Sequence, residues 1–421
     1  MAFLLRSLCA VIGAAFLFAV ANLFISGLPE GEDPAVQLAS GTPAAAPNAP
    51  TTTAVLRDVA FGLLGISTEP TAALQSAPGS TAPNSTAPNS SAPNSTALDA
   101  GTTQGAFTQT SFVQAAPSAL ASDLEAEWRS WMAANDVTEG AMVVLMPDGA
   151  MHRAGLDRAT DASAPVASLS KAITGMCMDI VLQEQGLGWY TSLGDIAPQM
   201  SALRVTPQPW NQDITLAALV NHTSGLAPDL TQGTMGSDLH GALGLHRRTA
   251  SEALREENMQ GTPREYFYNN TNYAVLGVAI EALTGQSYGD ACMERVVTPA
   301  GVTDAVIHGA MGSRSSFGGW EMSAESYARL AQFWFTQGNE VVDRPYDRPM
   351  HDNYSLGYVI HGSGADAQVS HAGRFCHTDS PNTGAYFHAR GDGVVFSANW
   401  TGPCVAATDT GLDRAIADLM R

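Results

Sequence analysis

The sequence predicts an α+β domain in which strands from both ends of the domain share one antiparallel sheet. Near the start of this domain, two short segments at 141–146 and 150–152 flank the turn Pro147-Asp148-Gly149 as a hairpin, and apolar and polar residues alternate near its end, at 354–400. The segments between these two regions carry apolar residues at helical spacing instead. Helices in the middle with antiparallel strands on both sides indicate that the terminal strands pair with each other.

The individual elements follow from the same patterns and from their end signals. Helices are expected at 119–135, from Ser168 to a glycine stop at Gly186 or Gly188, and at 215–221, 272–284 and 324–336. Strands are expected at 141–146, 150–152, 354–361, 369–371, 384–389 and 393–400.

The N-terminal 28 residues have the features of a membrane segment. Residues 7–28 carry no charge, with Arg6 before them and acidic residues after them. About 20 apolar residues are enough to span a bilayer, and a positive residue on the N-terminal side predicts that the following chain lies outside. The alternative is a signal peptide cleaved after the Ala-Val-Ala at 19–21. We favour a retained anchor at residues 7–28, because the apolar segments of cleavable signals are typically only about 7–15 residues long. Both interpretations predict export: the anchor gives a periplasmic domain held at the membrane, and cleavage gives a secreted one.

Residues 29–117 have the composition of a disordered linker. The motif Ala-Pro-Asn-Ser occurs three times in succession between Ala82 and Thr96. Segments of small polar residues and proline bury too little apolar surface to fold. We therefore expect three parts, namely 1–28, the linker 29–117 and a folded domain over 118–421.

Charge excludes one class of partner. The 421 residues include 40 acidic and 20 basic side chains, for a net charge of −20, and the longest basic run is Arg247–Arg248. A chain of this kind lacks the clustered positive charge that binds a phosphate backbone. We expect no nucleic-acid partner.

Cysteines allow several pairings. Five are present, and Cys9 lies in the N-terminal apolar segment, so four remain in the domain with three possible connectivities. Cys376 and Cys404 flank the expected terminal hairpin and are the favoured pair. Buried free thiols are the alternative.

The strongest chemical motif is Ser168-Leu169-Ser170-Lys171 at the start of a helix. A spacing of three residues puts Ser168 and Lys171 on one helix face, about 5–6 Å apart at Cβ. Lys171 is the single lysine of the chain, and every other basic residue is arginine. Arginine cannot release a proton at this position, whereas a lysine with a lowered pKa can act as a base for a serine nucleophile.

Two further motifs carry complementary chemistry. Tyr268-Asn269-Asn270 offers a phenol that can transfer a proton and an amide that can hold a substrate. His371-Ala372-Gly373, followed by Arg374, lies on an expected strand. Small residues beside a hydrogen-bonding side chain leave room for a substrate backbone to pair along the strand.

Together and in this order, the three motifs resemble the penicillin-recognising serine hydrolases, which include class C β-lactamases, D-alanyl-D-alanine carboxypeptidases and related esterases. The resemblance extends over about residues 119–421 and includes Asn221-His222-Thr223-Ser224-Gly225-Leu226. It implies a β-lactamase/transpeptidase-like fold with a mostly helical middle subdomain. It also implies roles for seven residues: Ser168 as the acylated nucleophile, Lys171 and Tyr268 as the proton-transfer pair, and Asn270, His371, Gly373 and Arg374 as substrate-binding residues. The oxyanion hole would use the backbone N–H groups of Ser168 and Arg374.

One position differs from the β-lactamase pattern. The strand motif begins with His371, where β-lactamases of this type carry a lysine that binds the β-lactam carboxylate. A histidine is more similar to the carboxypeptidases and esterases. The sequence therefore predicts an esterase or carboxypeptidase type of hydrolase rather than an efficient β-lactamase.

Other motifs have structural explanations. Gly285-Gln286-Ser287-Tyr288-Gly289 fits the G-x-S-x-G pattern, but it follows a helix, whereas a nucleophile elbow follows a strand. His240 and His246 lack a zinc-binding spacing, and His222 is either a site residue or a structural loop histidine. No glycine loop for phosphate precedes a helix. We expect no metal and no organic cofactor.

Two classes of function remain open. The first is an exported serine hydrolase that acts on a small-molecule or cell-wall peptide substrate through an acyl-enzyme. The second is a catalytically silent binding or sensor module on the same fold. The single lysine in the first motif favours the enzyme, because a silent module has no need of it.

Overall fold

The computed structural model describes residues 118–231, 245–255, 258, 260–307, 315–376 and 381–421. The predicted membrane segment, the linker and both predicted domain boundaries lie outside these residues. Within the described part of the chain, no helix has the length and apolar character needed to cross a membrane.

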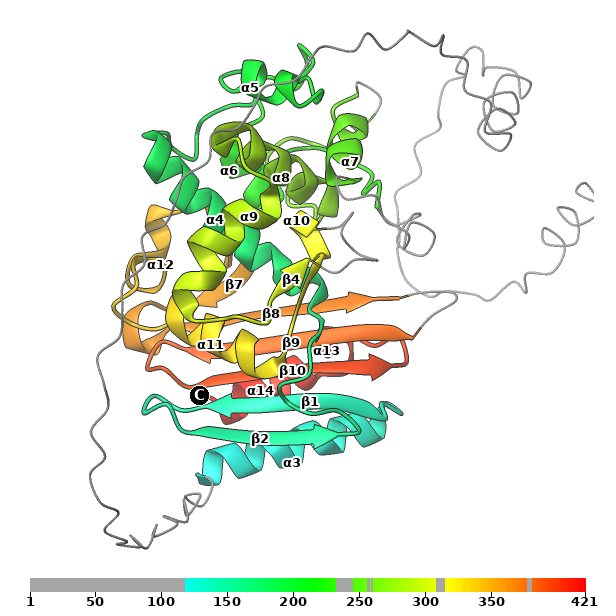
Figure 1. The fold of residues 1–421 in the computed structure, drawn as a ribbon, viewed down its shortest axis with the longest axis vertical. Coiled ribbons are helices and arrows are strands. Elements are labelled where there is room, and N and C mark those ends of the chain that lie inside the picture. Colours follow the sequence, from blue (N-terminus) through cyan, green and yellow to red (C-terminus); the bar gives the residue numbers. More distant parts are fainter. Residues whose placement is uncertain (1–117, 232–244, 256–257, 259, 308–314, 377–380) are drawn as a thin grey trace, which may run out of the picture. The chain divides into compact units, whose positions relative to one another are not determined.

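The domain is organised around a seven-stranded antiparallel sheet with the order β2-β1-β10-β9-β8-β7-β6 (Figure 1). Its strands are β1 (Glu139–Leu145), β2 (Met151–Leu156), β6 (Tyr354–Ser355), β7 (Tyr358–His361), β8 (Gln368–Phe375), β9 (Asn382–Arg390) and β10 (Val395–Gly402). The first strand pairs with the last, so that Ala141 lies opposite Asn399. The prediction that the terminal strands share one sheet is confirmed.

Helices and a small second sheet complete the domain. The longer helices are α3 (Ala119–Ala134), α4 (Ser170–Gln185), α7 (Leu245–Ala253), α8 (Asn270–Thr284), α11 (Ala324–Trp334) and α14 (Leu412–Leu419). The shorter ones include α5 (Ala197–Ala202), α6 (Leu216–Val220), α9 (Tyr288–Cys292), α10 (Ser315–Gly318), α12 (Glu340–Asp343) and α13 (Ala407–Thr410). The small sheet has the order β3 (Ala164–Pro165), β5 (Trp320–Met322), β4 (Val306–Ile307).

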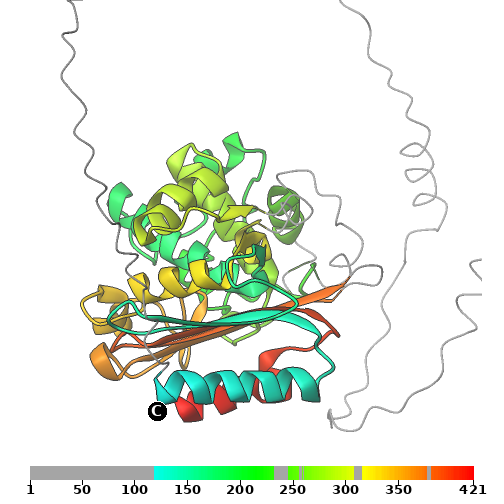
Figure 2. The same ribbon diagram turned by 60° about the horizontal axis from the view of Figure 1, so that its bottom comes forward.

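Hydrophobic cores form on both faces of the large sheet. Figure 2 shows α3 and α14 against one face and most of the other helices over the opposite face. The short helix α13 lies on the side of α3, because Trp131 donates a hydrogen bond to Thr410. Along β10, Phe396 and Trp400 pack in the core beneath α3 and α14, whereas Val395 packs in the core on the helical side. This alternation is expected because successive side chains of a strand point to opposite faces. The sheet is thus covered on both sides, and the candidate site lies where its helical face meets α4 and α8.

Two predicted strands differ from the observed ones. The strand expected at 354–361 is a tight hairpin, because Leu356 and Gly357 adopt positive φ angles of 45° and 87° and separate β6 from β7. A Cβ on residue 357 would lie 2.2 Å from the carbonyl carbon of Lys171. Glycine therefore lets the hairpin turn rest directly on the first turn of α4. The strand expected at 369–371 is longer and forms β8, Gln368–Phe375.

The C-terminal helix α14 is an element that the sequence reading missed. Its apolar residues Leu412 and Ile416 are fully buried in the core shared with α3. Their i, i+4 spacing was a helical signal, but the segment is short and begins at Gly411.

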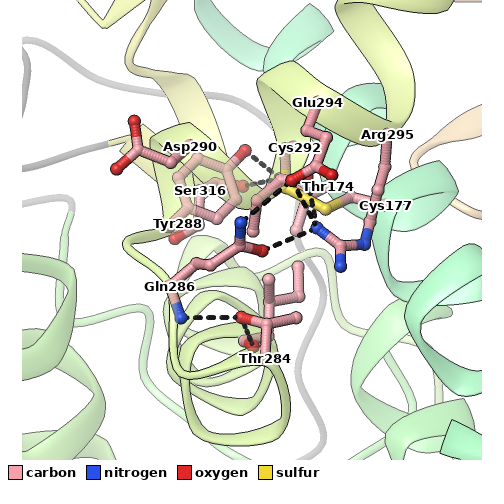
Figure 3. The surroundings of a disulfide bond; sticks show 12 residues. Thr174, Cys177, Thr284, Gln286, Tyr288, Asp290, Cys292, Glu294, Arg295 and Ser316 are labelled. Carbon is pink, nitrogen blue, oxygen red and sulfur yellow. Dashed lines mark hydrogen bonds and ion pairs between the residues drawn. A yellow bond between two sulfur atoms is a disulfide. The ribbon is translucent and has the colours of Figure 1, made fainter. Parts of the chain in front are cut away.

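Both pairs of domain cysteines are bonded. The favoured pair Cys376–Cys404 is confirmed, and Cys177–Cys292 is a second disulfide. The alternative of free buried thiols is therefore wrong for these four. Figure 3 shows that Cys177–Cys292 lies close to Thr174 and Tyr288, whose hydroxyl groups are 2.7 Å apart. This disulfide joins α4 to α9 within the helical part of the domain.

Candidate active site

The first predicted motif forms a compact turn. Ser168 lies in a 3₁₀ turn, η1 (Ala167–Leu169), directly before α4, and Lys171 lies in the first turn of α4. The Lys171 amine Nζ donates a hydrogen bond to Ser168 Oγ at 3.0 Å and another to the Phe317 carbonyl at 2.9 Å. Ala167 has a φ of 49°, a region that non-glycine residues rarely occupy and that is associated with functional sites. The structure brings Ser168 and Lys171 together as their spacing predicts.

The environment of Lys171 allows its amine to exchange a proton near neutral pH. Its side chain is fully buried. Burial lowers the pKa of Lys171 from its ordinary value to about 7, against the opposing effect of the negative charge of Asp229. An amine with this pKa is neutral in a substantial fraction of molecules near pH 7. Lys171 can therefore accept the proton of Ser168, which an ordinary lysine cannot do.

Tyr268 lies beside the same amine. The centroid of its ring is 4.9 Å from Lys171 Nζ. Burial raises the pKa of the Tyr268 phenol above its ordinary value, and a side-chain hydrogen bond with Ser168 opposes this shift. The residue as a whole keeps 36% of its surface exposed, because it lines the cavity described below. A neutral phenol beside Ser168 can donate a proton to a leaving group.

The His222 ring packs against the Tyr268 ring. The two ring centroids are 4.5 Å apart. His222 Nδ1 accepts the backbone N–H of Asn269 at 3.2 Å, so Nε2 carries the ring hydrogen and donates it to the Tyr354 hydroxyl at 3.2 Å. Burial also holds the pKa of His222 well below its ordinary value. Of the two interpretations of His222, the structure agrees with a structural histidine. It is buried and neutral, and it packs against Tyr268 without lining the cavity.

Asn270 is the first residue of α8. Its side-chain nitrogen Nδ2 donates to Thr231 Oγ1 at 2.9 Å. Its oxygen Oδ1 is buried and has no hydrogen-bond partner among the described residues. A buried unpaired acceptor is costly. Asn270 itself lines the cavity, and its predicted contact with a substrate stays a prediction.

Strand β8 offers an open edge next to Ser168. β7 pairs with β8 only from Gln368 to Ser370, so the described strands leave the edge from His371 to Arg374 without a neighbouring strand on that side. Gly373 lies on this part and packs against η1. An extended substrate can pair with such an edge.

His371 is uncharged in this setting. It is 8% exposed, and burial together with the nearby charge of Lys171 lowers its pKa to about 3. Its ring is stacked with that of Tyr268 at a centroid distance of 6.4 Å. Its Nε2 is buried without a partner among the described residues. A neutral imidazole offers one donor and one acceptor and no fixed charge for a carboxylate.

The Arg374 side chain forms an ion pair with the C-terminal part of the domain. Its guanidinium pairs with Asp409 of α13, and both side chains are about half exposed. The cation that follows the strand motif is thus already paired, although both partners line the candidate cavity.

These residues surround one cavity of about 830 Å³. The predicted site residues in its wall are Ser168, Tyr268, Asn270, His371, Gly373 and Arg374. Lys171 lies beneath the wall, behind Ser168. The volume falls within the usual range for small-molecule sites.

Some residues near the site were missed by sequence reasoning. Tyr266 and Tyr354 line the cavity, and Tyr266 is stacked on His351 at a centroid distance of 5.3 Å. The aromatic run at 266–268 was a usable signal for Tyr266. Asp229 and Thr231, which contact Asn270, carried no signal, because they lie in a loop far from it in the sequence.

The G-x-S-x-G motif at 285–289 and His246 have structural roles. Gly285 ends α8, and Ser287 caps α9 by accepting the backbone N–H of Asp290. The G-x-S-x-G pattern is therefore a helix stop followed by a cap. His246 is buried against Glu281, whereas His240 lies outside the described residues. No group of three or more potential ligand side chains that could hold a metal ion occurs in the described ranges.

Comparisons with known proteins identify the family and the fold of this chain. Residues 128–417 match the model of the Beta-lactamase family. Penicillin-binding protein 4 of Amycolatopsis lactamdurans is 30% identical over 160 residues, which is 37% of this chain and 39% of the relative, so the match spans well under half of that protein. D-amino acid amidase from Ochrobactrum anthropi SV3 is similar in fold, with a TM-score of 0.57 and 15% identity over 72% of this chain and 98% of the other. So is a β-lactamase/D-alanine carboxypeptidase from Pseudomonas syringae, with a TM-score of 0.54 and 13% identity over 72% and 99%.

The family match covers more than half of the chain, and the solved structures share its architecture of an antiparallel sheet flanked by helices. The chain belongs to the β-lactamase family, within the serine hydrolase superfamily that also contains penicillin-binding proteins.

Proposed function

We propose that this chain is an exported serine hydrolase that cleaves an amide or ester through an acyl-enzyme on Ser168. One observation carries the proposal: the fully buried amine of Lys171, with a pKa of about 7, lies 3.0 Å from Ser168 Oγ. A buried base beside a hydroxyl is the arrangement that activates a serine nucleophile.

In the acylation step, neutral Lys171 takes the proton of Ser168. Ser168 Oγ then forms a bond to the carbonyl carbon of the substrate, and the carbonyl oxygen becomes an oxyanion that the backbone N–H groups of Ser168 and Arg374 stabilise. The bond to the leaving group breaks as Tyr268 donates a proton to it, and Tyr268 regains a proton from protonated Lys171. Each proton transfer contributes on the order of 10²–10⁴-fold to the rate.

In the deacylation step, water replaces the leaving group. The same pair, Lys171 and Tyr268, removes a proton from water while its oxygen attacks the acyl carbon. The ester bond to Ser168 Oγ breaks, Oγ takes up the proton, and the carboxylic acid leaves. The cycle needs no metal or organic cofactor.

The substrate-binding residues His371 and Arg374 favour small esters, amides or cell-wall peptides over β-lactams. His371 has no charge at neutral pH because its pKa is lowered to about 3, and Arg374 is paired with Asp409. Neither residue therefore offers an unpaired positive charge to a β-lactam carboxylate. In the proposed cellular setting, residues 7–28 anchor the domain in the membrane and the linker 29–117 extends it into the periplasm.

Labelling with a fluorophosphonate probe, followed by mass mapping, tests the proposal. The expected result is one adduct on Ser168. A chain that is folded by circular dichroism but takes up no label, and hydrolyses no nitrophenyl ester, would be a silent binding module instead.

A further inference from the structure

We propose that Thr174 and Tyr288 are positioning residues for the candidate base Lys171. Their hydroxyl groups hold the backbone of residues 316–320, and the Phe317 carbonyl in this segment keeps the Lys171 amine turned toward Ser168. This inference rests on the proposed hydrolase function and assigns a role in it to two residues outside the cavity wall.

The Phe317 carbonyl restricts the directions in which the amine can act. A neutral amine has two N–H groups and one lone pair, and a base must present that lone pair to the proton it takes. Lys171 Nζ lies 2.9 Å from the Phe317 carbonyl oxygen and 3.0 Å from Ser168 Oγ. A carbonyl only accepts hydrogen bonds, so an N–H group has to face Phe317. The lone pair then stays available for the Ser168 hydroxyl.

A chain of hydrogen bonds holds the segment that carries this carbonyl. The indole Nε1 of Trp320 donates to the Tyr288 hydroxyl at 2.9 Å. The Tyr288 and Thr174 hydroxyl groups are 2.7 Å apart, and Thr174 donates to the Ser316 carbonyl. All four residues are at most 1% exposed. None of these groups can therefore exchange its partner for bulk water.

The direction of the chain follows from its two ends. An indole nitrogen only donates and a carbonyl only accepts. The Thr174 hydroxyl also lies 3.2 Å from the Ser170 carbonyl, but either carbonyl takes its hydrogen. The Tyr288 hydrogen therefore joins the two hydroxyl groups. Because the ends of the chain, Ser316 and Trp320, lie on either side of Phe317, removal of either hydroxyl interrupts the chain and frees the segment.

Helices α4 and α9 supply the fixed points of this chain. Thr174 lies on α4, three residues after Lys171, and Tyr288 is the first residue of α9. The disulfide Cys177–Cys292 joins the same two helices, as Figure 3 shows. Cys177 follows Thr174 by three residues, and residues at this spacing share a helix face. The disulfide thus keeps α9 against the face of α4 that carries Thr174.

Variants of the two residues measure the role of the hydroxyl groups. Thr174→Val keeps the shape and removes the hydroxyl, so the rate constant for labelling of Ser168 by a fluorophosphonate should fall roughly three- to tenfold. The kcat for p-nitrophenyl acetate should fall by a similar factor, while KM changes little because neither residue lines the cavity. Thr174→Ser keeps the hydroxyl and should retain most of both rates. Tyr288→Phe should show the same loss as Thr174→Val.

Thr284→Val is the matched control. The Thr284 hydroxyl also donates to a carbonyl four residues earlier, that of Ile280, at 2.7 Å, but its hydrogen bonds stay within α8 and the turn after it. The rates of this variant should equal those of the wild type. The end point of labelling counts the active chains, and each rate is expressed per labelled chain. A smaller folded fraction therefore does not imitate the effect.

A double-mutant cycle separates positioning of the amine from a general loss of packing. In a Lys171→Ala background the chain of hydrogen bonds has no amine to orient. Adding Thr174→Val should then leave the remaining labelling rate unchanged. A purely structural role of Thr174 would lower the rate by the same factor in both backgrounds.

Four results would overturn the inference: unchanged rates in both Thr174→Val and Tyr288→Phe, an equal loss in Thr174→Ser and Thr174→Val, a loss of the same size in Thr284→Val, or the same factor for Thr174→Val with and without the Lys171 amine. In each case a wild type that is labelled on Ser168 leaves the proposed hydrolase function standing. A wild type that takes up no label and hydrolyses no ester would overturn the proposed function, and this inference with it.

Discussion

Gly373 of β8 packs so closely against Ser168 that a Cβ atom on residue 373 would lie 2.6 Å from the Ser168 backbone nitrogen. The same atom would lie 2.9 Å from the carbonyl oxygen of Val166. The turn that carries the candidate nucleophile therefore rests on the open edge of the sheet. Any side chain at residue 373 pushes the two apart.

Gly373→Ala should reduce kcat/KM for a nitrophenyl ester at least tenfold, because the added methyl group displaces the Ser168 N–H that serves the proposed oxyanion hole. Gly188→Ala is the matched control, because nothing lies within 4 Å of a Cβ there. Steady-state kinetics of both variants check this. Equal activity of the two would mean that the turn shifts without consequence.

Ser168→Ala should remove all labelling by a fluorophosphonate and leave the circular dichroism spectrum unchanged, because only one hydroxyl group is deleted. Ser287→Ala should still be labelled, since Ser287 serves as the cap of α9. Mass mapping of the adduct decides between the two serines. An adduct on Ser287 would refute the proposed mechanism.

Lys171→Arg should lower kcat on the order of 10²–10⁴-fold, about as much as Lys171→Ala. Arginine preserves the positive charge but does not release its proton near neutral pH. The comparison requires that both variants are folded, as judged by circular dichroism. Turnover of Lys171→Arg near the wild-type rate would show that a charge is sufficient at this position.

The pH profile of kcat/KM should rise with pH and have its midpoint near pH 7. Lys171 has a pKa of about 7 in the folded chain, and below that pH it is protonated and unable to accept the proton of Ser168. Neither His371, whose pKa is lowered to about 3, nor His222, whose pKa lies well below its ordinary value, explains such a limb. A profile that stays flat between roughly pH 5 and 8 would contradict the assignment of Lys171 as the base.

Small nitrophenyl esters should be cleaved faster than a chromogenic cephalosporin, because His371 carries no charge for the β-lactam carboxylate. His371→Lys should raise β-lactam acylation relative to ester turnover. The measurement is kcat/KM for both substrates on both proteins, with the ester as the internal control for the fold. A preference of the wild type for the cephalosporin would argue against the esterase or carboxypeptidase type.

The catalytic motifs could be predicted from the sequence, whereas the residues that pack around them could not. Ser168 and Lys171 are three residues apart at the start of a helix. Because helix geometry alone brings residues at this spacing together, their contact could be predicted. The hairpin turn at Leu356–Gly357 was missed because its geometry depends on packing against α4, which lies far away in the sequence. For the same reason nothing in the sequence linked Asp229 to Asn270.

The pKa of Lys171 shows a second limit. The sequence predicted that a lowered pKa was needed, but only the three-dimensional packing supplies it, through complete burial of the amine. The roles of the candidate residues stay predictions until the variants are measured.

The pairing of β1 with β10 has a consequence for synthesis. Ala141 of β1 pairs with Asn399 of β10, and contacts between residues so far apart in the sequence slow folding. All seven candidate site residues precede β10 in the chain, yet β10 is the strand that joins β1 to β9. A growing chain that has passed Arg374 thus holds every residue of the candidate site while lacking the strand that closes the sheet. On this topology we expect the proposed activity only after β10 has been synthesised, so that a nascent chain still short of this strand is inert.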